Sequence, residues 1–396
     1  MSSRSAPLQD DQRFALMKFR RSVADVLKQE HDDYYLLRWL RARNWNPDAA
    51  EKMLRNSVKW RERWGVDKIE TWKAPQPLLD YFVHGLAGFD KEGAPFIVVP
   101  FGPLDMWGIL HTVSQGDLIR LTIQYLEKYL HLAYKQSLEH GNNARQLVVL
   151  FDMEGFNVKQ YTWRPAAEAV IQLIKMYEAN YPEILKYCYI INAPKVFAFV
   201  FNMVRKFLDE YTVNKIHIYK ADPQKWGPAV LERVDETNVP KFYGGTLLDS
   251  KGDPKCGEFI MWGGKVPEEA FNKKDNNENN NDFNETVIRK GGKLKMEFDC
   301  KDDGCFLKWE FRTYEHDIKF GVKCKNEKTG EIIEEIPLKR IASHQLDEVG
   351  FITCHPNCKY LVVFDNTYSY LRNKKIRYSI VLTEPMGEPD ILDVLD

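Results

Sequence analysis

The sequence predicts three structural parts: an all-α lead, an α/β domain with a mostly parallel sheet covered by helices, and a C-terminal antiparallel β-sandwich. Three observations support this fold class. Amphipathic helical stripes occupy the start of the chain, solid apolar strands alternate with long helices in the middle, and apolar residues recur with period two towards the end. We therefore expect domains at 1–75, 76–250 and 283–384, with a linker at 251–282.

Length and composition narrow the class of protein. The chain has 396 residues, which is typical of two or three domains. Its net charge of −1 argues against a polyelectrolyte partner, so we expect no nucleic-acid binding. The polar start, MSSRSAPLQDDQR, lacks the apolar segment of a secretion signal. Seven scattered cysteines are too few for a disulfide scaffold, and we expect reduced thiols in a cytoplasmic protein.

The lead contains signals for three helices. Residues 11–30 carry an apolar stripe with helical spacing, and the aspartates at 32–33 can cap a second helix. The third helix begins at Asn46, with Pro47 in its first turn, and ends at Gly65, a residue type suited to the position after a helix.

The lead is also basic. Its first 73 residues contain 16 lysines and arginines against 11 aspartates and glutamates, a balance of +5. Two interpretations remain open: attraction to an anionic membrane surface, or a solvated helical face that only keeps the domain soluble.

The middle of the chain alternates strands and helices. Residues 96–99 and 147–151 have the pattern of continuous apolar strands, and 118–138 and 165–179 that of helices, the first of them opened by Ser114. Solid apolar strands between helices are typical of a parallel sheet that is buried on both faces. The sequence has neither a dinucleotide glycine fingerprint nor a GK[ST] phosphate loop, which argues against a nucleotide-binding fold.

The most unusual stretch is 195–208, which has helical length but almost no polar face. A short strand at 189–191 precedes it and another at 216–219 follows, the order expected of a parallel crossover. The helix must be hidden in a core, inserted in lipid, or able to alternate between the two. It is too short to span a bilayer, which takes about 20 apolar residues. Its apolar residues are Phe197, Phe199, Val200, Phe201, Met203, Val204, Phe207 and Leu208.

Several motifs resemble those of one family. NYPEILKYCYIINAP at 180–194, the apolar helix, TVNKIHIY at 212–219 and NVPKFYGGT at 238–246 resemble the lipid-binding domain of the Sec14 (CRAL-TRIO) family. YYLLRWLRARNW at 34–45 is similar to the helical lead of Sec14-like proteins. The resemblance implies a protein that holds one hydrophobic ligand under the apolar helix and exchanges it at a membrane, without catalysis or a cofactor. It also implies the residues of the gate helix over the lipid pocket: Phe197, Phe199, Val200, Phe201, Val204, Phe207 and Leu208.

A polar headgroup site is implied by the same resemblance. In family members that bind phosphatidylinositol, a small set of side chains holds the phosphorylated headgroup, and the matching positions here are Arg43, Glu183, Thr212 and Lys215. Arg43 and Lys215 can donate charge-assisted hydrogen bonds to phosphate, while Glu183 and Thr212 can bond inositol hydroxyls. This sequence departs from the family at Asn44, where relatives often carry a basic residue. The alternative is structural: Glu183 pairs with Lys215, and Arg43 ties the lead to the sheet.

The identity of the ligand stays open at this level. Phosphatidylinositol and an isoprenoid such as tocopherol, squalene or a carotenoid both fit the resemblance, and an apolar ligand would need fewer polar contacts. Phosphatidylcholine is less well supported, because LVVLF at 147–151 offers no hydroxyl side chain where the family places them. The expected partners are the lipid and, transiently, a membrane surface.

The C-terminal part has a different pattern. An Asn-rich run, NKKDNNENNNDFN at 272–284, predicts a mobile linker. Alternating apolar residues then predict strands of an antiparallel sandwich. The alternating sets are Leu294, Met296 and Phe298; Leu307, Trp309 and Phe311; Ile318, Phe320 and Val322; and Ile376, Tyr378, Ile380 and Leu382.

The last predicted strand belongs to a second resemblance. FDNTYSYLRNKKIRYSI at 364–380 resembles the end of a GOLD domain, the sandwich of p24-type Golgi trafficking proteins. The order of lead, lipid domain and GOLD domain is similar to that of animal Sec14-like proteins. It implies a possible protein partner and an alternative function, a lipid-sensing adaptor in membrane trafficking or signalling that docks partners through its GOLD domain.

Two carboxylates raise the question of catalysis. Asp152 and Glu154 follow a strand end, where open α/β sheets often place catalytic groups. The G-x-S-x-G elbow of a lipase or esterase is absent from the sequence. We therefore expect that the protein is not an enzyme.

A cysteine-rich stretch raises the question of a metal. Cys354, His355 and Cys358 could bind zinc together with Cys300 and Cys305. The CHPNC spacing is not the usual C-x₂-C knuckle, so we favour paired thiols at strand ends and expect no metal.

Overall fold

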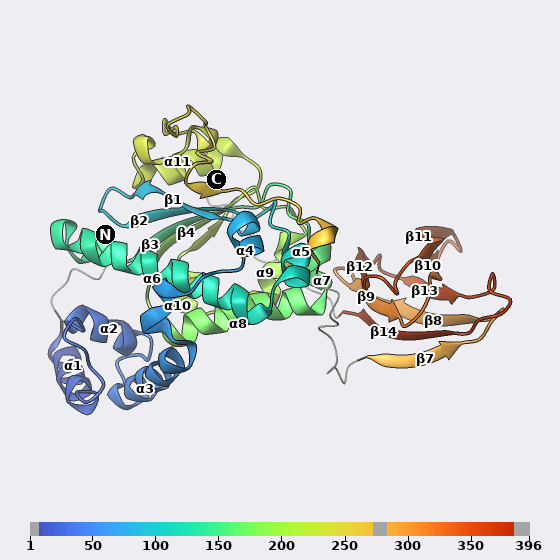
Figure 1. Ribbon diagram of the computed structural model, residues 1–396, viewed down its shortest axis with the longest axis horizontal. Helices are drawn as coiled ribbons and strands as arrows, with labels where there is room; N and C mark the ends of the chain where they lie inside the picture. The colour runs from blue at the N-terminus through green and yellow to red at the C-terminus, as the bar shows by residue number, and fades with distance from the viewer. Residues whose placement is uncertain (1–7, 272–282, 384–396) are drawn as a thin grey trace.

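The computed structural model describes residues 8–271 and 283–383 and contains the three predicted parts (Figure 1). A helical lead packs beside a larger α/β domain, and an antiparallel β-sandwich lies at one end of the molecule. The predicted fold class is therefore confirmed. Of the Asn-rich run at 272–284, only the last two residues belong to the described ranges. Within those ranges, no helix is both long enough and apolar enough to cross a membrane.

Three packed helices form the lead: α1 (Asp10–Ser22), α2 (Asp33–Arg41) and α3 (Pro47–Trp64). The prediction of a helix over 11–30 is wrong in length, because the chain leaves helical geometry at Val23, where φ is −109°. Arg55 of α3 contacts this exit. Its guanidinium donates to the carbonyl of Ser22 at 2.7 Å and pairs with Asp25 at 2.8 Å. The end of α1 thus coincides with a tertiary contact, although the apolar periodicity of the sequence continues beyond this point.

The predicted starts of α2 and α3 are confirmed. The Asp32 carboxylate accepts a hydrogen bond from the Tyr35 N–H at 2.9 Å. The Asn46 side chain accepts two backbone N–H groups of the first turn of α3, both at 3.1 Å. α3 ends at Gly65, whose φ of 63° lies in the left-handed region that glycine tolerates without strain.

A six-stranded sheet forms the centre of the α/β domain, in the order β5-β4-β3-β2-β1-β6. β2 to β5 are parallel, whereas β1 pairs antiparallel with both β2 and β6. The predicted crossover is present, because β4 and β5 are parallel neighbours joined through α9. The strands are β1 (His84–Phe89), β2 (Pro95–Pro100), β3 (Leu147–Asp152), β4 (Leu185–Ile191), β5 (Ile216–Ile218) and β6 (Ile260–Met261).

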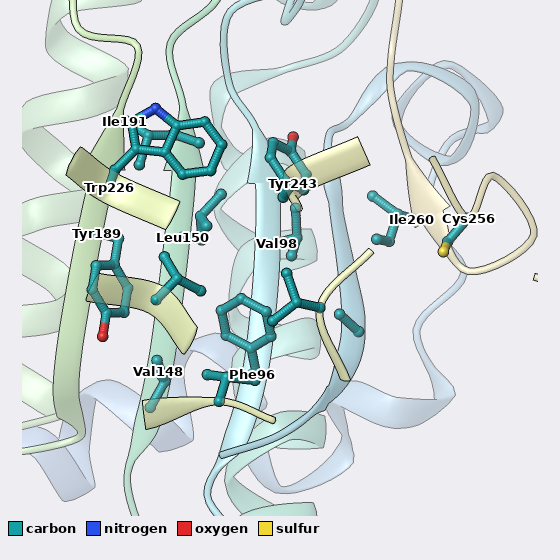
Figure 2. Packing of buried hydrophobic residues seen from close by; sticks show 14 of the residues in the cluster. Phe96, Val98, Val148, Leu150, Tyr189, Ile191, Trp226, Tyr243, Cys256 and Ile260 are labelled. Carbon is teal, nitrogen blue, oxygen red and sulfur yellow. The ribbon is translucent and has the colours of Figure 1, made fainter. Parts of the chain in front are cut away.

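Helices cover both faces of this sheet. On one face, Trp226 of α11 and Tyr243 belong to the same buried apolar cluster as Phe96, Leu150 and Ile191, and Figure 2 shows Trp226 beside Ile191. On the other face lie α6, α8 and α9 (Figure 1). The helices of this domain are α4 (Gln76–Tyr81), α5 (Met106–Thr112), α6 (Gln115–His140), α7 (Lys159–Thr162), α8 (Arg164–Asn180), α9 (Phe197–Arg205), α10 (Glu210–Val213) and α11 (Pro223–Arg233). Short 3₁₀ turns occur at Val66–Thr71, Asn142–Ala144, Glu236–Asn238, Lys241–Tyr243 and Glu268–Ala270.

Two four-stranded antiparallel sheets form the sandwich, in the orders β11-β10-β13-β8 and β12-β9-β14-β7. Between them, the fully buried ring of Phe320 lies 4.7 Å from that of Phe311 and 5.1 Å from that of Phe364. The four alternating sets predicted from sequence lie on β8, β9, β10 and β14. The strands are β7 (Asn284–Ile288), β8 (Lys293–Cys300), β9 (Phe306–Thr313), β10 (Ile318–Asn326), β11 (Ile332–Ile341), β12 (Glu348–Thr353), β13 (Cys358–Asp365) and β14 (Lys374–Leu382).

The sandwich contacts the α/β domain beside α7 and the start of α8 (Figure 1). The Arg164 N–H donates to the Glu310 carboxylate at 3.2 Å, and Lys159 pairs with Glu348 at 3.5 Å. Val349 of β12 belongs to the same buried apolar cluster as Trp163. Helix α8 therefore begins against the sandwich.

Candidate functional site

A cavity of about 430 Å³ lies between the sheet and helices α6, α8 and α9. Small-molecule sites typically enclose about 300–1,000 Å³, so this cavity has the size of a ligand pocket. Most of the surrounding side chains are apolar, and β3 contributes Val149 and Phe151. The predicted inner face of the 165–179 helix is only half-buried, because Val170, Ile174 and Tyr177 face this cavity instead of a filled core.

Helix α9 forms one wall of the cavity. Of the predicted gate residues, Phe197, Val200, Phe201, Val204 and Leu208 are in the lining. The ring of Phe207 is instead 4.9 Å from the ammonium group of Lys175 and is not part of the lining. The side chain of Phe199 lies outside the described part of the structure.

The bounds of α9 differ from the prediction. The helix covers Phe197–Arg205, whereas 195–208 was expected, and Leu208 lies in the following turn. Phe197 and Phe201 are only 8% and 7% exposed, while Arg205 and Lys206 are exposed. The segment therefore presents apolar rings to the interior and cationic groups to solvent.

Three of the four predicted headgroup residues lie together. Glu183, Thr212 and Lys215 all line the cavity, near the amino ends of β4 and β5. The Lys215 ammonium donates to the Leu185 carbonyl and lies 4.0 Å from the ring centre of Tyr211. The structure thus brings a cation, a carboxylate and a hydroxyl to one end of an apolar cavity.

Arg43 does not join this group. It is exposed, its guanidinium donates to the Ala42 carbonyl at 2.6 Å, and it is absent from the cavity lining. Arg38 is the lead arginine that reaches the amino end of β4, since its Nε donates to the Pro182 carbonyl at 2.8 Å. Arg38 was not among the site residues predicted from the sequence. The available signal was its position inside α2, which ends at Arg41, so that Arg43 lies beyond the helix.

A pair of carboxyl groups also lies at this end, and the sequence analysis missed it as well. Glu178 of α8 and Asp209, the cap of α10, both line the cavity. Asp209 accepts the Thr212 N–H at 2.5 Å. Burial and the nearby Asp209 charge raise the pKa of Glu178 to about 7, although a hydrogen bond from Thr212 opposes the shift. Glu178 therefore retains a proton in the folded protein at pH values where a free glutamate has lost it.

We expect Glu178→Gln to reduce the dependence of stability on pH. The pKa of Glu178 is raised from 4.5 to about 7, so stability is highest below pH 4.5 and falls as pH rises through 7. Because the side chain is only half-buried and solvent screens its charge, we expect an effect of about 1–2 kcal/mol. Urea unfolding at pH 5 and pH 8 measures it, with Glu168→Gln on the same helix as the matched control. If the free energy of unfolding of Glu178→Gln changed between pH 5 and pH 8 as much as that of the wild type, Glu178 would not be the group responsible.

The carboxylate of Asp152 has a structural role. Its side chain is 3% exposed and accepts hydrogen bonds from the Glu154 N–H at 3.0 Å, the Asn192 amide at 2.8 Å and the Tyr243 hydroxyl at 3.0 Å. These bonds join the ends of β3 and β4 to a segment some 90 residues further along the chain. Asp152 is thus a fixed acceptor at the centre of a packing network.

The cysteines of the sandwich are buried as well. All seven cysteines of the chain have free thiols and are buried. Burial raises the pKa of Cys300 to about 12 and that of Cys354 to about 11, which keeps both thiols protonated near neutral pH. Among the residues that the structure describes, no group of three or more His, Cys, Asp or Glu side chains has an arrangement that could hold a metal ion.

The site is thus an apolar cavity under a crossover helix of an α/β domain, behind a three-helix lead. Residues 79–245 match the CRAL/TRIO domain, and residues 9–56 match the CRAL/TRIO N-terminal domain. These two segments of the chain are therefore similar to a CRAL/TRIO domain and to the helical domain that precedes it.

Two proteins of Caenorhabditis elegans and one solved structure are similar to this chain. Protein ctg-1 of Caenorhabditis elegans is 28% identical over 360 residues, which are 89% of this chain and 92% of that protein. A CRAL-TRIO domain-containing protein of the same organism is 28% identical over 306 residues, but these span 75% of this chain and only 41% of that protein's length. The crystal structure of Sfh5 aligns with 67% of this chain and 96% of its own, at 16% identity and a TM-score of 0.49.

Proposed function

We propose that this protein binds one lipid in the cavity under α9 and exchanges it at membranes without making or breaking a bond. The single observation that carries the proposal is the apolar cavity of about 430 Å³ with α9 as one wall. Membership of residues 79–245 in the CRAL/TRIO domain supports it. The protein would act in the cytoplasm and contact membranes transiently.

The energetics of lipid transfer favour a closed carrier. Each methylene of a lipid that leaves an apolar environment for water costs about 0.8 kcal/mol, so free diffusion of a long-chain lipid through the aqueous phase is rare. A cavity closed by α9 removes this cost during transit. At a membrane, the gate helix would open, place its apolar rings in the interface, and bring the exposed Arg205 and Lys206 to the headgroups.

Two ligand classes fit the cavity. The cation, carboxylate and hydroxyl of Lys215, Glu183 and Thr212 support a phosphatidylinositol headgroup at the amino end of β4 and β5, with Arg38 beside it. Arg43 would contribute only from outside the cavity. The apolar remainder supports an isoprenoid such as tocopherol, squalene or a carotenoid. The cavity has about three times the roughly 150 Å³ that holds benzene in an engineered protein, which favours a single oily guest over two long acyl chains.

A lipid-sensing adaptor is the alternative, and one observation favours it. Helix α8 lines the cavity through Ile174 and Tyr177 and begins against the sandwich at Arg164. A ligand that shifts α8 could therefore alter what the sandwich binds. In this alternative, the sandwich is a GOLD domain that docks a protein partner. We assign the lead to 1–75, the lipid domain to 76–250, the linker to 251–282 and the GOLD domain to 283–384. Within the assigned linker, β6 pairs with β1 and so extends the sheet of the lipid domain.

Native mass spectrometry with organic extraction of the purified protein tests the proposal. We expect one lipid per chain in the wild type. Ile174→Trp should carry little or none, because the larger ring occupies the cavity that Ile174 lines. Gln172→Ala is the matched control, because Gln172 is exposed on the same helix and lies outside the cavity lining. A folded wild type that neither carries lipid nor takes it up from vesicles would refute lipid binding.

A further inference from the structure

A second polar site lies in the cavity, away from the proposed headgroup residues. His84 and Tyr129 both line the cavity, and the imidazole Nδ1 is 2.8 Å from the Tyr129 hydroxyl. The ring of Tyr125 lies beside His84, with the ring centres 3.6 Å apart and the ring planes tilted by 44°. These three side chains come from the start of β1 and from one face of α6. They are a polar cluster in a wall that is otherwise apolar.

Sheet geometry places this cluster at the opposite end of the cavity from Lys215. Gly85 pairs with Val98, so His84 lies near the carboxyl end of β2. Lys215 instead precedes the amino end of β5. Because β2 to β5 are parallel, those two ends belong to opposite edges of the sheet. A phospholipid with its headgroup at Lys215 would place the end of an acyl chain beside His84. An acyl chain has no group that can form a hydrogen bond with a ring nitrogen.

The imidazole has an unused hydrogen-bonding atom. Burial, assisted by the positive charge of Lys128, lowers the pKa of His84 to about 4, so the ring is neutral near pH 7. In a neutral imidazole, one nitrogen donates and the other accepts. Nδ1 bonds Tyr129, and in the described part of the structure Nε2 has no hydrogen bond. His84 is half-buried and is one of the residues that line the cavity, where a ligand would lie.

We propose that His84 Nε2 receives the hydroxyl group of a lipid alcohol, a ligand with one oily body and one hydroxyl, and that Tyr129 positions the imidazole. A hydroxyl matches this site better than a carbonyl or an ether, because it can both donate and accept. It therefore satisfies Nε2 in either tautomer that the Tyr129 bond allows. The Tyr125 hydroxyl, which has no hydrogen bond within the described ranges, lies beside the same ring. This inference rests on the proposed lipid binding and selects among its ligands.

The test uses phytanol and phytane, branched isoprenoids that differ only in one hydroxyl. Phosphatidylcholine vesicles containing both are incubated with the full-length protein, and the two lipids bound to the repurified protein are quantified by mass spectrometry. We expect Tyr129→Phe and His84→Phe to lower the ratio of bound phytanol to phytane about tenfold, the equivalent of 1.4 kcal/mol. Uptake of phytane should stay as in the wild type, which also shows that the variants fold.

Tyr134→Phe is the matched control, since Tyr134 is on the same helix but is 39% exposed and lies outside the cavity lining. An unchanged ratio in folded Tyr129→Phe and His84→Phe, or an equal fall in Tyr134→Phe, would overturn the hydroxyl site while lipid binding stands. If the wild type takes up none of phytanol, phytane and phosphatidylinositol from vesicles, the proposed lipid binding is refuted, and the hydroxyl site with it.

Discussion

Phe201→Asp is expected to reduce lipid retention at least tenfold while leaving a folded protein. The Phe201 ring is 7% exposed, lines the cavity and lies 6.1 Å from the ring of Phe197. A carboxylate at this position would have to face apolar side chains of β4 and α9 without an ionic partner. It would instead turn outward and take α9 away from the sheet. The cavity would then be open to water.

Two measurements check this prediction. Lipid that co-purifies is quantified after organic extraction, and transfer of phosphatidylinositol and α-tocopherol between phosphatidylcholine vesicles is followed with time. Phe201→Leu is the matched control, because it keeps an apolar side chain in the same place, and it should retain most of the lipid. If folded Phe201→Asp carried and transferred lipid like the wild type, α9 would not be the gate.

Phe320→Ala is expected to lower the free energy of unfolding of the sandwich by about 3–5 kcal/mol, the usual cost of removing a buried phenylalanine ring. Phe320 has no exposed surface. Its ring centre lies 4.7 Å from that of Phe311, 5.1 Å from that of Phe364 and 5.4 Å from that of Trp309. Alanine would leave a void that both sheets line, and main-chain pairing limits how far they can collapse into it.

Chemical denaturation followed by circular dichroism and by tryptophan fluorescence measures this change. Tyr370→Ala is the control, since Tyr370 is 85% exposed and its removal should cost less than about 0.5 kcal/mol. The α/β domain has its own apolar clusters, so we expect lipid uptake by Phe320→Ala to be unchanged under native conditions. A loss below 1 kcal/mol would show that the ring does not stabilise the sandwich as its burial indicates.

Local sequence signals were sufficient to predict an element where the tertiary structure favours the same conformation. Asn46, Pro47 and Gly65 specify the ends of α3 by their own backbone chemistry, and no distant contact is needed. The apolar run at 147–151 likewise becomes β3, since a strand buried on both faces has few alternatives. β1 was missed, because HGLAGF is rich in glycine and becomes a strand only through pairing with β2 and β6.

The candidate site was predictable only in part, because its parts meet through tertiary packing. The motif around Glu183 and the one around Lys215 flank neighbouring strands, so their proximity follows from the crossover. Whether Arg38 or Arg43 reaches the amino end of β4 depends on where α2 ends and on how this helix packs against the α/β domain. The bond between His84 and Tyr129 joins residues 45 positions apart, and neither residue belongs to a motif.

The hydrogen bonds of Asp152 hold the chain at the start of α9, the helix that we propose as the gate of the cavity. Asn192, which bonds Asp152 at 2.8 Å, lies just before α9, so the entry to this helix is anchored to two strand ends and to Tyr243. The exit is held at Asp209 and Glu178, whose association depends on a proton. If α9 is the gate that we propose, its two ends are therefore held unequally. We expect the helix to pivot about its Asn192 end, and the contact between Asp209 and Glu178 to weaken as the solution becomes more alkaline.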